Sequence, residues 1–202
     1  MKIPKQILIG TKCQAKLREI REILGDVPCE LLSPEEVGPL PAIVEDGATF
    51  EQNACKKACE LARHFGMAVL ADDSGLEVDA LDGRPGVLSH RYGGEDTTDL
   101  ENNLKLLAEL EGVPEEQRMA RYRCVVALAT PRGLQLTADG TCRGRIALEP
   151  SGTNGFGYDP LFYYAAYGAT FGSIDASLKN QVSHRAEAVR RLRELLLKKA
   201  RP

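Results

Sequence analysis

The sequence predicts an α/β protein in which a mixed central sheet is flanked by helices. Helical and strand-like segments alternate along most of the chain, which favours this class. Two apolar segments at residues 122–130 and 134–137 flank Pro131-Arg132-Gly133, a pattern typical of two antiparallel strands joined by a turn. The sequence shows no internal repeat and no long linker, so we expect residues 1–202 to form one domain.

The chain opens with a strand and a helix. The apolar run Gln6–Ile9 predicts a buried strand, and the loop Gly10-Thr11 follows it. The next apolar residues recur at helical spacing and form one stripe: Leu17, Ile20, Ile23 and Leu24. Gly25-Asp26 ends this helix, and four prolines at positions 28–41 predict an irregular surface stretch after it.

Three further helices have recognisable ends. Thr49 with Gln52, and Thr98 with Glu101, have the spacing of a capping box, which predicts the start of a helix at each place. A last helix is predicted at residues 183–199, because its apolar side is followed by two lysines that suit the C-terminal end of the helix dipole.

Two adjacent carboxylates follow the apolar run Met67–Leu70. We expect Asp72 and Asp73 at the end of a strand, where α/β proteins place functional groups. Neighbouring acids repel unless a cation lies beside them, and Mg²⁺ is the commonest such partner of oxygen ligands. With Glu45, these acids would bind Mg²⁺ and phosphate oxygens, and one aspartate would take a proton from water. The alternative is a polar turn, because Asp, Ser and Gly all favour turns.

Three other segments carry residues suited to a nucleotide. Thr11–Lys16 leaves a strand and opens a helix, where backbone N–H groups and a lysine suit phosphate; an ordinary helix start with a solvated lysine is the alternative. Asn154–Pro160 combines glycines, aromatic rings and one acid, which favours stacking on a base; packing of a buried loop is the alternative. His184-Arg185 places two cationic side chains at a helix N-terminus, where a bound anion or a base carbonyl would offset the unfavourable dipole.

Composition narrows the classes of partner. Lys plus Arg total 26 against 29 for Asp plus Glu, so the net charge of -3 argues against nucleic acid or acidic lipid as a partner. The chain has no apolar run that would span a bilayer and no secretory signal at its start, so we expect a cytoplasmic protein. The cysteines are scattered without a close pair, which favours reduced thiols over zinc: Cys13, Cys29, Cys55, Cys59, Cys124 and Cys142.

Together these segments resemble the inosine triphosphate pyrophosphatase family, whose members are also called Ham1-like proteins. The match runs almost end to end and rests on five motifs: Glu45–Ala58, Leu70–Leu76, Gly83–Tyr92, Phe156–Pro160 and Ser183–Arg185. The resemblance implies an α/β fold with two lobes around a deep cleft, usually as a homodimer. It also implies Mg²⁺-dependent hydrolysis of inosine, deoxyinosine and xanthosine triphosphates to the monophosphate and pyrophosphate.

The resemblance further implies roles for single residues. Asp73 is the implied general base, and the implied metal-binding acids are Glu45, Asp72 and Asp73. The implied substrate-binding residues divide between the triphosphate and the base. They are Thr11, Lys16, Lys57 and Ser74 for the triphosphate, with Phe156, Gly157, Tyr158, Asp159, Lys179, His184 and Arg185 for the base.

One departure from the family leaves other functions open. The family's first motif usually reads Thr-Gly-Asn, whereas this chain has Thr11-Lys12-Cys13, so an asparagine amide is absent and backbone N–H groups, Lys12 or water must contact phosphate there. A purine nucleotide sensor without catalysis is therefore one alternative function. A general metal-dependent phosphatase that releases orthophosphate is another, although the loop around Phe156 argues against it.

Overall fold

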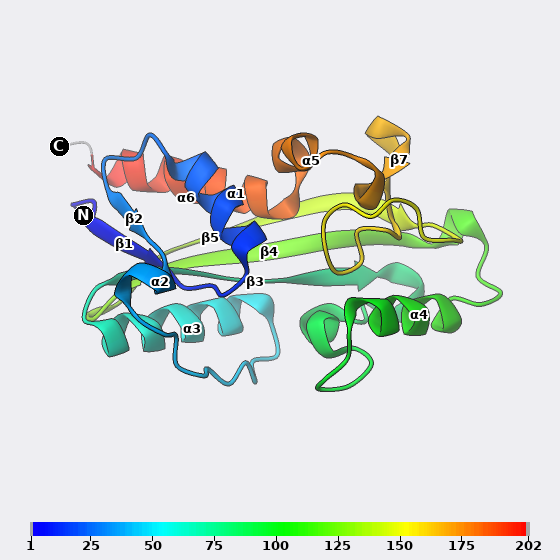
Figure 1. The fold of residues 1–202 in the computed structure, drawn as a ribbon, viewed down its shortest axis with the longest axis horizontal. Coiled ribbons are helices and arrows are strands. Elements are labelled where there is room, and N and C mark those ends of the chain that lie inside the picture. The colour runs from blue at the N-terminus through cyan, green and yellow to red at the C-terminus, as the bar shows by residue number, and fades with distance from the viewer. Residues whose placement is uncertain (1, 201–202) are drawn as a thin grey trace. The chain divides into compact units, whose positions relative to one another are not determined.

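Seven strands form one mixed sheet in the computed structural model, which describes residues 2–200 (Figure 1). The order across the sheet is β2-β1-β3-β4-β5-β6-β7. The pairs β1–β2 and β1–β3 are parallel, whereas β5–β6 and β6–β7 are antiparallel. The strands are β1 (Gln6–Ile9), β2 (Glu30–Leu32), β3 (Ala68–Val78), β4 (Met119–Thr130), β5 (Gly133–Ile146), β6 (Phe162–Tyr164) and β7 (Ala169–Thr170). The predicted α/β class with a mixed sheet and flanking helices is confirmed.

The helices lie between and after these strands. They are α1 (Gln14–Leu24), α2 (Pro34–Val37), α3 (Phe50–Phe65), α4 (Asp99–Glu109), α5 (Ala176–Val182) and α6 (His184–Ala200). Short 3-10 helices occur at Asp79–Leu81, Gly86–Arg91, Glu115–Gln117, Ala165–Tyr167 and Phe171–Ser173. Among residues 2–200, no helix has both the length and the apolar character that crossing a membrane requires. The predicted domain spans residues 1–202, and its two end residues lie outside the part of the chain that the structure describes.

The chain divides into two compact units. Unit 1 contains the described residues up to Asp73, then Cys124–Gly140 and the described residues from His184 onward. Unit 2 contains Ser74–Arg123 and Thr141–Ser183. The long strands β3, β4 and β5 therefore each contribute residues to both units.

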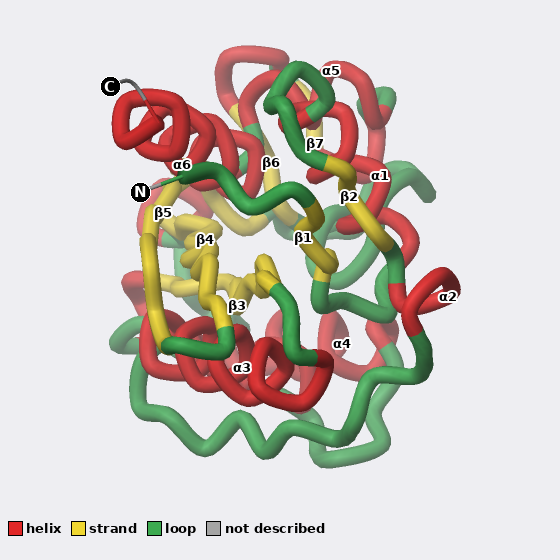
Figure 2. Tube along the Cα trace, turned by 90° about the vertical axis from the view of Figure 1, so that its left-hand side faces the viewer, coloured by secondary structure: helices red, strands yellow, loops and turns green. Residues whose placement is uncertain are grey.

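In unit 1, helices cover both faces of the sheet. Helices α1 and α6 lie together on one face, and α3 lies on the other (Figure 1). Figure 2 shows α6 and α3 on opposite sides of β4 and β5. The predicted stripe of α1 is buried here with one side of α6 and alternate residues of the strands: Leu17, Ile20, Leu24, Val189, Leu192, Ile7, Ile9, Leu70 and Val126. Burial of this apolar face supplies most of the stability of such a helix.

In unit 2, a second core forms around aromatic rings. The ring of Tyr122 lies 4.6 Å from that of Phe162, whose own centroid is 5.0 Å from the ring of Phe171. Helix α4 adds Leu106 and the residue after its end, Leu110, joins the same core. Offset and tilted contacts of this kind are the preferred geometries of aromatic pairs.

The main correction to the predicted elements concerns Asp72 and Asp73. We predicted them at the end of a strand, with a polar turn as the alternative, but β3 continues through both of them to Val78. Leu76 and Val78 beyond the acids are buried in the core of unit 2, and their burial favours the extended conformation. The acids therefore lie in the middle of a strand.

Smaller differences occur before α3. The proline-rich stretch contains β2 and α2, because Ser33 and Glu36 form a capping box around Pro34 at the start of α2. The Thr49 hydroxyl caps α3 as predicted by accepting from the backbone N–H of Gln52. The Gln52 side chain, however, accepts from Ala48 N at 2.8 Å. The other predicted helix ends and the hairpin of β4 and β5 are confirmed.

Candidate functional site

The two neighbouring aspartates of β3 have different surroundings. Successive side chains of a strand point to opposite faces. Asp72 contacts Lys16 of α1, with 2.8 Å between Oδ2 and Nζ, whereas Asp73 accepts from Nδ2 of Asn53 on α3 at 3.0 Å. Because α1 and α3 cover opposite faces of the sheet, the strand gives each acid its own environment. Residues that are adjacent in the sequence can therefore have separate chemical roles.

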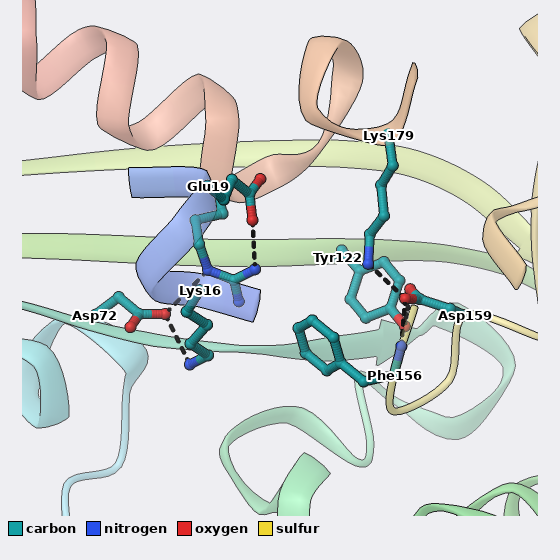
Figure 3. A network of polar contacts seen from close by, with 8 residues as sticks. Lys16, Glu19, Asp72, Tyr122, Phe156, Asp159 and Lys179 are labelled. Carbon is teal, nitrogen blue, oxygen red and sulfur yellow. Dashed lines mark hydrogen bonds and ion pairs between the residues drawn. The ribbon is translucent and has the colours of Figure 1, made fainter. Parts of the chain in front are cut away.

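Asp72 is held as a carboxylate (Figure 3). Its Oδ2 accepts from Lys16 and lies 3.3 Å from Nε of Arg185, at the start of α6. Burial alone would raise the pKa of Asp72, but the positive charges of Lys16 and Arg185 outweigh this effect and hold the pKa well below its ordinary value. Asp72 is therefore a fixed negative charge in the neutral pH range.

Arg185 connects Asp72 to a second buried acid. Its Nη1 donates to Oε2 of Glu19 at 3.0 Å, and only 1% of Arg185 is exposed. A guanidinium with two carboxylate partners keeps its charge despite burial. The resemblance implied that Arg185 contacts the base; the described contacts place its side chain in unit 1 with Asp72 and Glu19, and the contact with a base stays a prediction.

Asp73 has the opposite electrostatic environment. Burial raises its pKa to about 6, against the opposing hydrogen bond from Asn53, and the nearby charge of Glu45 adds to the rise. Asn53 is itself buried, and its Oδ1 accepts from the backbone N–H of Gly47 at 2.7 Å. One amide thus connects the loop that carries Glu45 to the carboxylate of Asp73.

Lys57 of α3 contacts both Glu45 and β3. Its Nζ forms an ion pair with Glu45 and donates to the backbone oxygen of Asp72 at 3.0 Å. Burial lowers the pKa of Lys57, but the charges of Asp72 and Glu45 more than offset this effect and raise it overall. The predicted residues Lys16, Glu45, Lys57, Asp72 and Asp73 are thus brought together in unit 1. We call this group, with Arg185, the acid–lysine cluster.

A metal ion would find a partial ligand set here. Within residues 2–200, no three His, Cys, Asp or Glu side chains form a group that could hold a metal ion. Mg²⁺ is commonly bound by only one or two carboxylates, with water and substrate phosphates completing the octahedron. Glu45 and Asp73 fit that requirement, because both are carboxylates and Asn53 joins the loop of Glu45 to Asp73 through its hydrogen bonds to Gly47 and to the Asp73 carboxylate.

The second group of predicted residues is in unit 2, on the loop between β5 and β6. The Asp159 carboxylate is almost fully buried and pairs with Nζ of Lys179 from α5 (Figure 3). It also accepts from the backbone N–H of Phe156 at 2.9 Å and from the hydroxyl of Tyr122 at 3.3 Å. Burial, together with the charge of Asp159, raises the pKa of Tyr122 well above its ordinary value, so Tyr122 remains a donor.

Phe156 and Lys179 lie next to each other in this group. The Lys179 ammonium is 4.6 Å from the centroid of the Phe156 ring, within the range of a cation–π contact. Phe156 is partly exposed, whereas Lys179 is buried. The loop therefore presents an aromatic ring with a positive charge beside it. We call Phe156, Asp159 and Lys179 the aromatic cluster.

Two of the other predicted residues, Tyr158 and Thr11, contact backbone groups. The hydroxyl of Tyr158 is buried and donates to the backbone oxygen of Ser89 at 2.8 Å. Thr11 Oγ1 accepts from the backbone N–H of Cys13 at 3.1 Å, directly before α1. His184 is buried at the start of α6, and Ser74 is half-buried on β3. The contacts predicted for these side chains with a nucleotide stay predictions.

The sequence did not indicate several residues that contact these two groups: Glu19, Asn53 and Tyr122, together with Asp99 and Asn103, which hydrogen-bond to Gly157 of the loop. Glu19 lies on the apolar stripe of α1, three residues after Lys16, and a charged residue in a buried stripe is a usable signal. Asn53 lies four residues before Lys57 on α3, and so shares its helix face. The remaining three act across long sequence separations, for which a single sequence carries no signal.

The fold places the chain among α/β proteins with a mixed sheet. A sequence model of the Ham1 family matches residues 7–195, and the chain belongs to that family. The family resemblance predicted from the motifs is thus confirmed.

Relatives and solved structures agree with this assignment. The chain is 50% identical over 191 residues to a dITP/XTP pyrophosphatase of Geobacter sulfurreducens, in a match that covers 95% of this chain and 96% of the relative. It is 46% identical to a dITP/XTP pyrophosphatase of Bacillus licheniformis, covering 95% and 98%. A Ham1 protein structure from Coxiella burnetii matches with a TM-score of 0.87 and 39% identity, covering 96% of this chain and 98% of that protein.

Proposed function

We propose that this protein hydrolyses the non-standard purine nucleoside triphosphates ITP, dITP and XTP to the monophosphate and pyrophosphate. Membership of the Ham1 family and the names of relatives at about half identity support this reaction. The single observation that carries it is the contrast between Asp72, kept ionised by cations, and Asp73, whose pKa burial raises to about 6. Two acids with separated pKa values are typical of a site that performs proton transfer near neutral pH.

In this proposal Asp73 takes the proton of the water that attacks the α-phosphorus. A general base must be ionised at the working pH. The pKa of Asp73 is about 6 in the metal-free protein, and a bound Mg²⁺ would lower it further below neutral pH. Asn53 holds one oxygen of the carboxylate and so fixes its orientation. Proton transfer by a well-placed side chain contributes roughly 10²–10⁴-fold in rate.

Lys16 and Lys57 neutralise the triphosphate in the proposed reaction. An ammonium group has three N–H donors, and the contact of Lys16 with Asp72 uses one of them. Asp72 and Glu45 fix the two lysines in place before substrate arrives. Prepositioned charges of this kind stabilise the negative charge that develops on the departing pyrophosphate without reorganising.

Mg²⁺ is the proposed cofactor, held by Glu45 and Asp73, while Asp72 of the same predicted ligand set pairs with Lys16 and Arg185. When bound, it supplies positive charge that polarises phosphate oxygens and lowers the repulsion between carboxylates and substrate. The ligand types support this choice, because hard carboxylate oxygens suit Mg²⁺ better than softer metals.

The aromatic cluster is proposed to recognise the base. Phe156 would stack on the purine, an interaction worth about 1–3 kcal/mol per base in other proteins. Lys179 would donate to O6 of hypoxanthine or xanthine, which adenine replaces with an amino group. A site with such a donor rejects the wrong base because a buried polar group is left without a partner.

We also propose that the protein acts in the cytoplasm as a homodimer, with nucleotides rather than nucleic acids or membranes as partners. The net charge of -3 supports the choice of a small anionic ligand. A reducing compartment is supported by the six cysteines, all within the described residues, of which none forms a disulfide.

Product analysis tests the proposed reaction. Purified protein is incubated with Mg²⁺ and ITP, GTP or ATP in parallel, and monophosphate, pyrophosphate and orthophosphate are quantified. Pyrophosphate with IMP, and little product from GTP and ATP, is the expected result. Tight binding of ITP without turnover would instead support a sensor, and orthophosphate release would support a general phosphatase.

A further inference from the structure

Helix α4 holds the loop of the aromatic cluster from outside it. The backbone N–H of Gly157 donates to Oδ2 of Asp99 at 2.6 Å, and the backbone oxygen of Gly157 accepts from Nδ2 of Asn103 at 3.0 Å. Asp99 and Asn103 are four residues apart on α4, so they project from the same face of the helix. Helix α4 therefore binds both the backbone N–H and the backbone oxygen of Gly157.

The clamped residue directly follows Phe156. Gly157 has φ of 62°, in the left-handed region that glycine adopts without strain. At Phe156 itself, the backbone N–H donates to Oδ2 of Asp159. Side chains thus fix the backbone at Phe156 and at Gly157, while the ring itself remains partly exposed.

Asn103 shows that this contact carries a cost. The residue is 8% exposed, and its Oδ1 is buried without a hydrogen-bond partner among the described residues. An unpartnered buried amide oxygen is unfavourable, and an apolar residue at this position would avoid it. The hydrogen bond described for Asn103 is the donation from its Nδ2 to the backbone oxygen of Gly157. This bond accounts for a polar side chain at this buried position.

We propose that Asp99 and Asn103 are positioning residues that set the orientation of Phe156 and thereby the affinity for the base. This inference rests on the proposed function, in which Phe156 stacks on a purine. Stacking depends on the plane of the ring, and α4 holds both backbone polar groups of Gly157, the residue directly after the one that carries the ring. Without the clamp, the loop would sample other orientations, and the protein would have to order it on binding.

The variants separate the clamp from the stability of α4. Asp99→Ala removes the acceptor from an exposed position, and Asn103→Leu removes the donor without adding a charge. Asp99→Asn keeps an acceptor oxygen and is the conservative rescue. Glu101→Ala is the matched control, because Glu101 lies in the same first turn but forms its capping box with Thr98.

Two measurements are made on each variant. Amide hydrogen exchange of the peptide covering residues 154–161 reports the clamp itself, whether or not the protein hydrolyses ITP. Steady-state kinetics with ITP report its effect on recognition. Loss of one such hydrogen bond is expected to raise KM about tenfold in Asp99→Ala and Asn103→Leu, with kcat within about twofold of wild type.

The expected pattern is faster exchange and higher KM in Asp99→Ala and Asn103→Leu, with Asp99→Asn and Glu101→Ala close to wild type. Equal effects in Asp99→Ala and Glu101→Ala would overturn the proposal, because helix stability would then explain both. Unchanged exchange of residues 154–161 would also overturn it. If wild type does not hydrolyse ITP, the proposed function fails, and the exchange data alone decide whether the clamp exists.

Discussion

Replacing Asp73 by Asn is expected to stabilise the metal-free protein at alkaline pH while it abolishes turnover. Burial raises the pKa of Asp73 from 3.8 to about 6 in the folded protein. Because the pKa of Asp73 is higher in the folded protein, the folded protein binds this proton more tightly than the unfolded chain does. Asp73 therefore favours folding most below pH 3.8, and this contribution is lost as pH rises through about 6. At pH 8 the folded protein therefore carries a buried charge that the unfolded chain exposes to water.

The size of this penalty follows from the difference in pKa. A shift of about two units corresponds to about 3 kcal/mol at 1.36 kcal/mol per unit. The amide introduced by Asp73→Asn has almost the shape of the carboxylate and still accepts from Asn53, so the packing and the hydrogen bond are kept. For a chain of this size, about 3 kcal/mol corresponds to a rise in Tm of roughly 6–12 °C.

Thermal unfolding in EDTA at pH 8 and pH 4 measures this effect. We expect Asp73→Asn to be more stable than wild type at pH 8, with most of the difference gone at pH 4, where wild-type Asp73 is protonated. Asp46→Asn is the matched control, because Asp46 is an exposed acid just before α3 that pairs with Lys56. Equal stability of Asp73→Asn and wild type at pH 8, or a difference that persists unchanged at pH 4, would show that burial does not raise the pKa of Asp73.

Three further substitutions test other parts of the site. Asp72→Asn should lower the free energy of unfolding in urea by about 3 kcal/mol, because it removes a carboxylate partner of the buried Arg185. Phe156→Ala should raise KM for ITP about tenfold through lost stacking, while Phe156→Tyr stays near wild type. Gly47→Ala should lower kcat more than it raises KM, because a Cβ there would lie 2.6 Å from Oδ1 of Asn53 and displace the amide that orients Asp73.

Each of these has a control or a contrary result. Asp139→Asn removes one carboxylate partner of the half-exposed Arg191, which also pairs with Glu187, and an equal loss of stability there would argue against a special role for burial at Asp72. If Phe156→Tyr raises KM for ITP as much as Phe156→Ala does, an aromatic ring at this position is not sufficient for binding the base. A wild-type kcat in Gly47→Ala would show that the position of the Asn53 amide does not affect catalysis.

Much of unit 1 could be predicted from local patterns. The stripe of α1 and the Thr49 cap depend on residues within two turns of each other, as does the Thr98 cap in unit 2, and the structure confirms them. The strand end predicted at Asp72 was wrong for a non-local reason. Leu76 and Val78 extend β3 because they pack in a core whose other members lie far along the chain.

The site was predicted as a set of residues but not as an arrangement. Motifs pointed to Asp72 and Asp73 as a pair, yet the strand directs them to different partners, Lys16 and Asn53. The contact between Arg185 and Glu19 joins helices at the two ends of the chain, and no local pattern indicates such a pairing. Side-chain roles that depend on tertiary contacts need the fold, whereas residue types and spacing suffice for the family.

In the proposed mechanism, water activated by Asp73 attacks the α-phosphorus of the substrate. Hydrolysis of ITP with Mg²⁺ in ¹⁸O-labelled water tests it directly, because the products are the same for attack at either phosphorus but the position of the label differs. We expect the label in IMP for the wild type and no turnover for Asp73→Asn. Label in pyrophosphate would place the attack at the β-phosphorus, and undiminished turnover by Asp73→Asn would exclude Asp73 as the base.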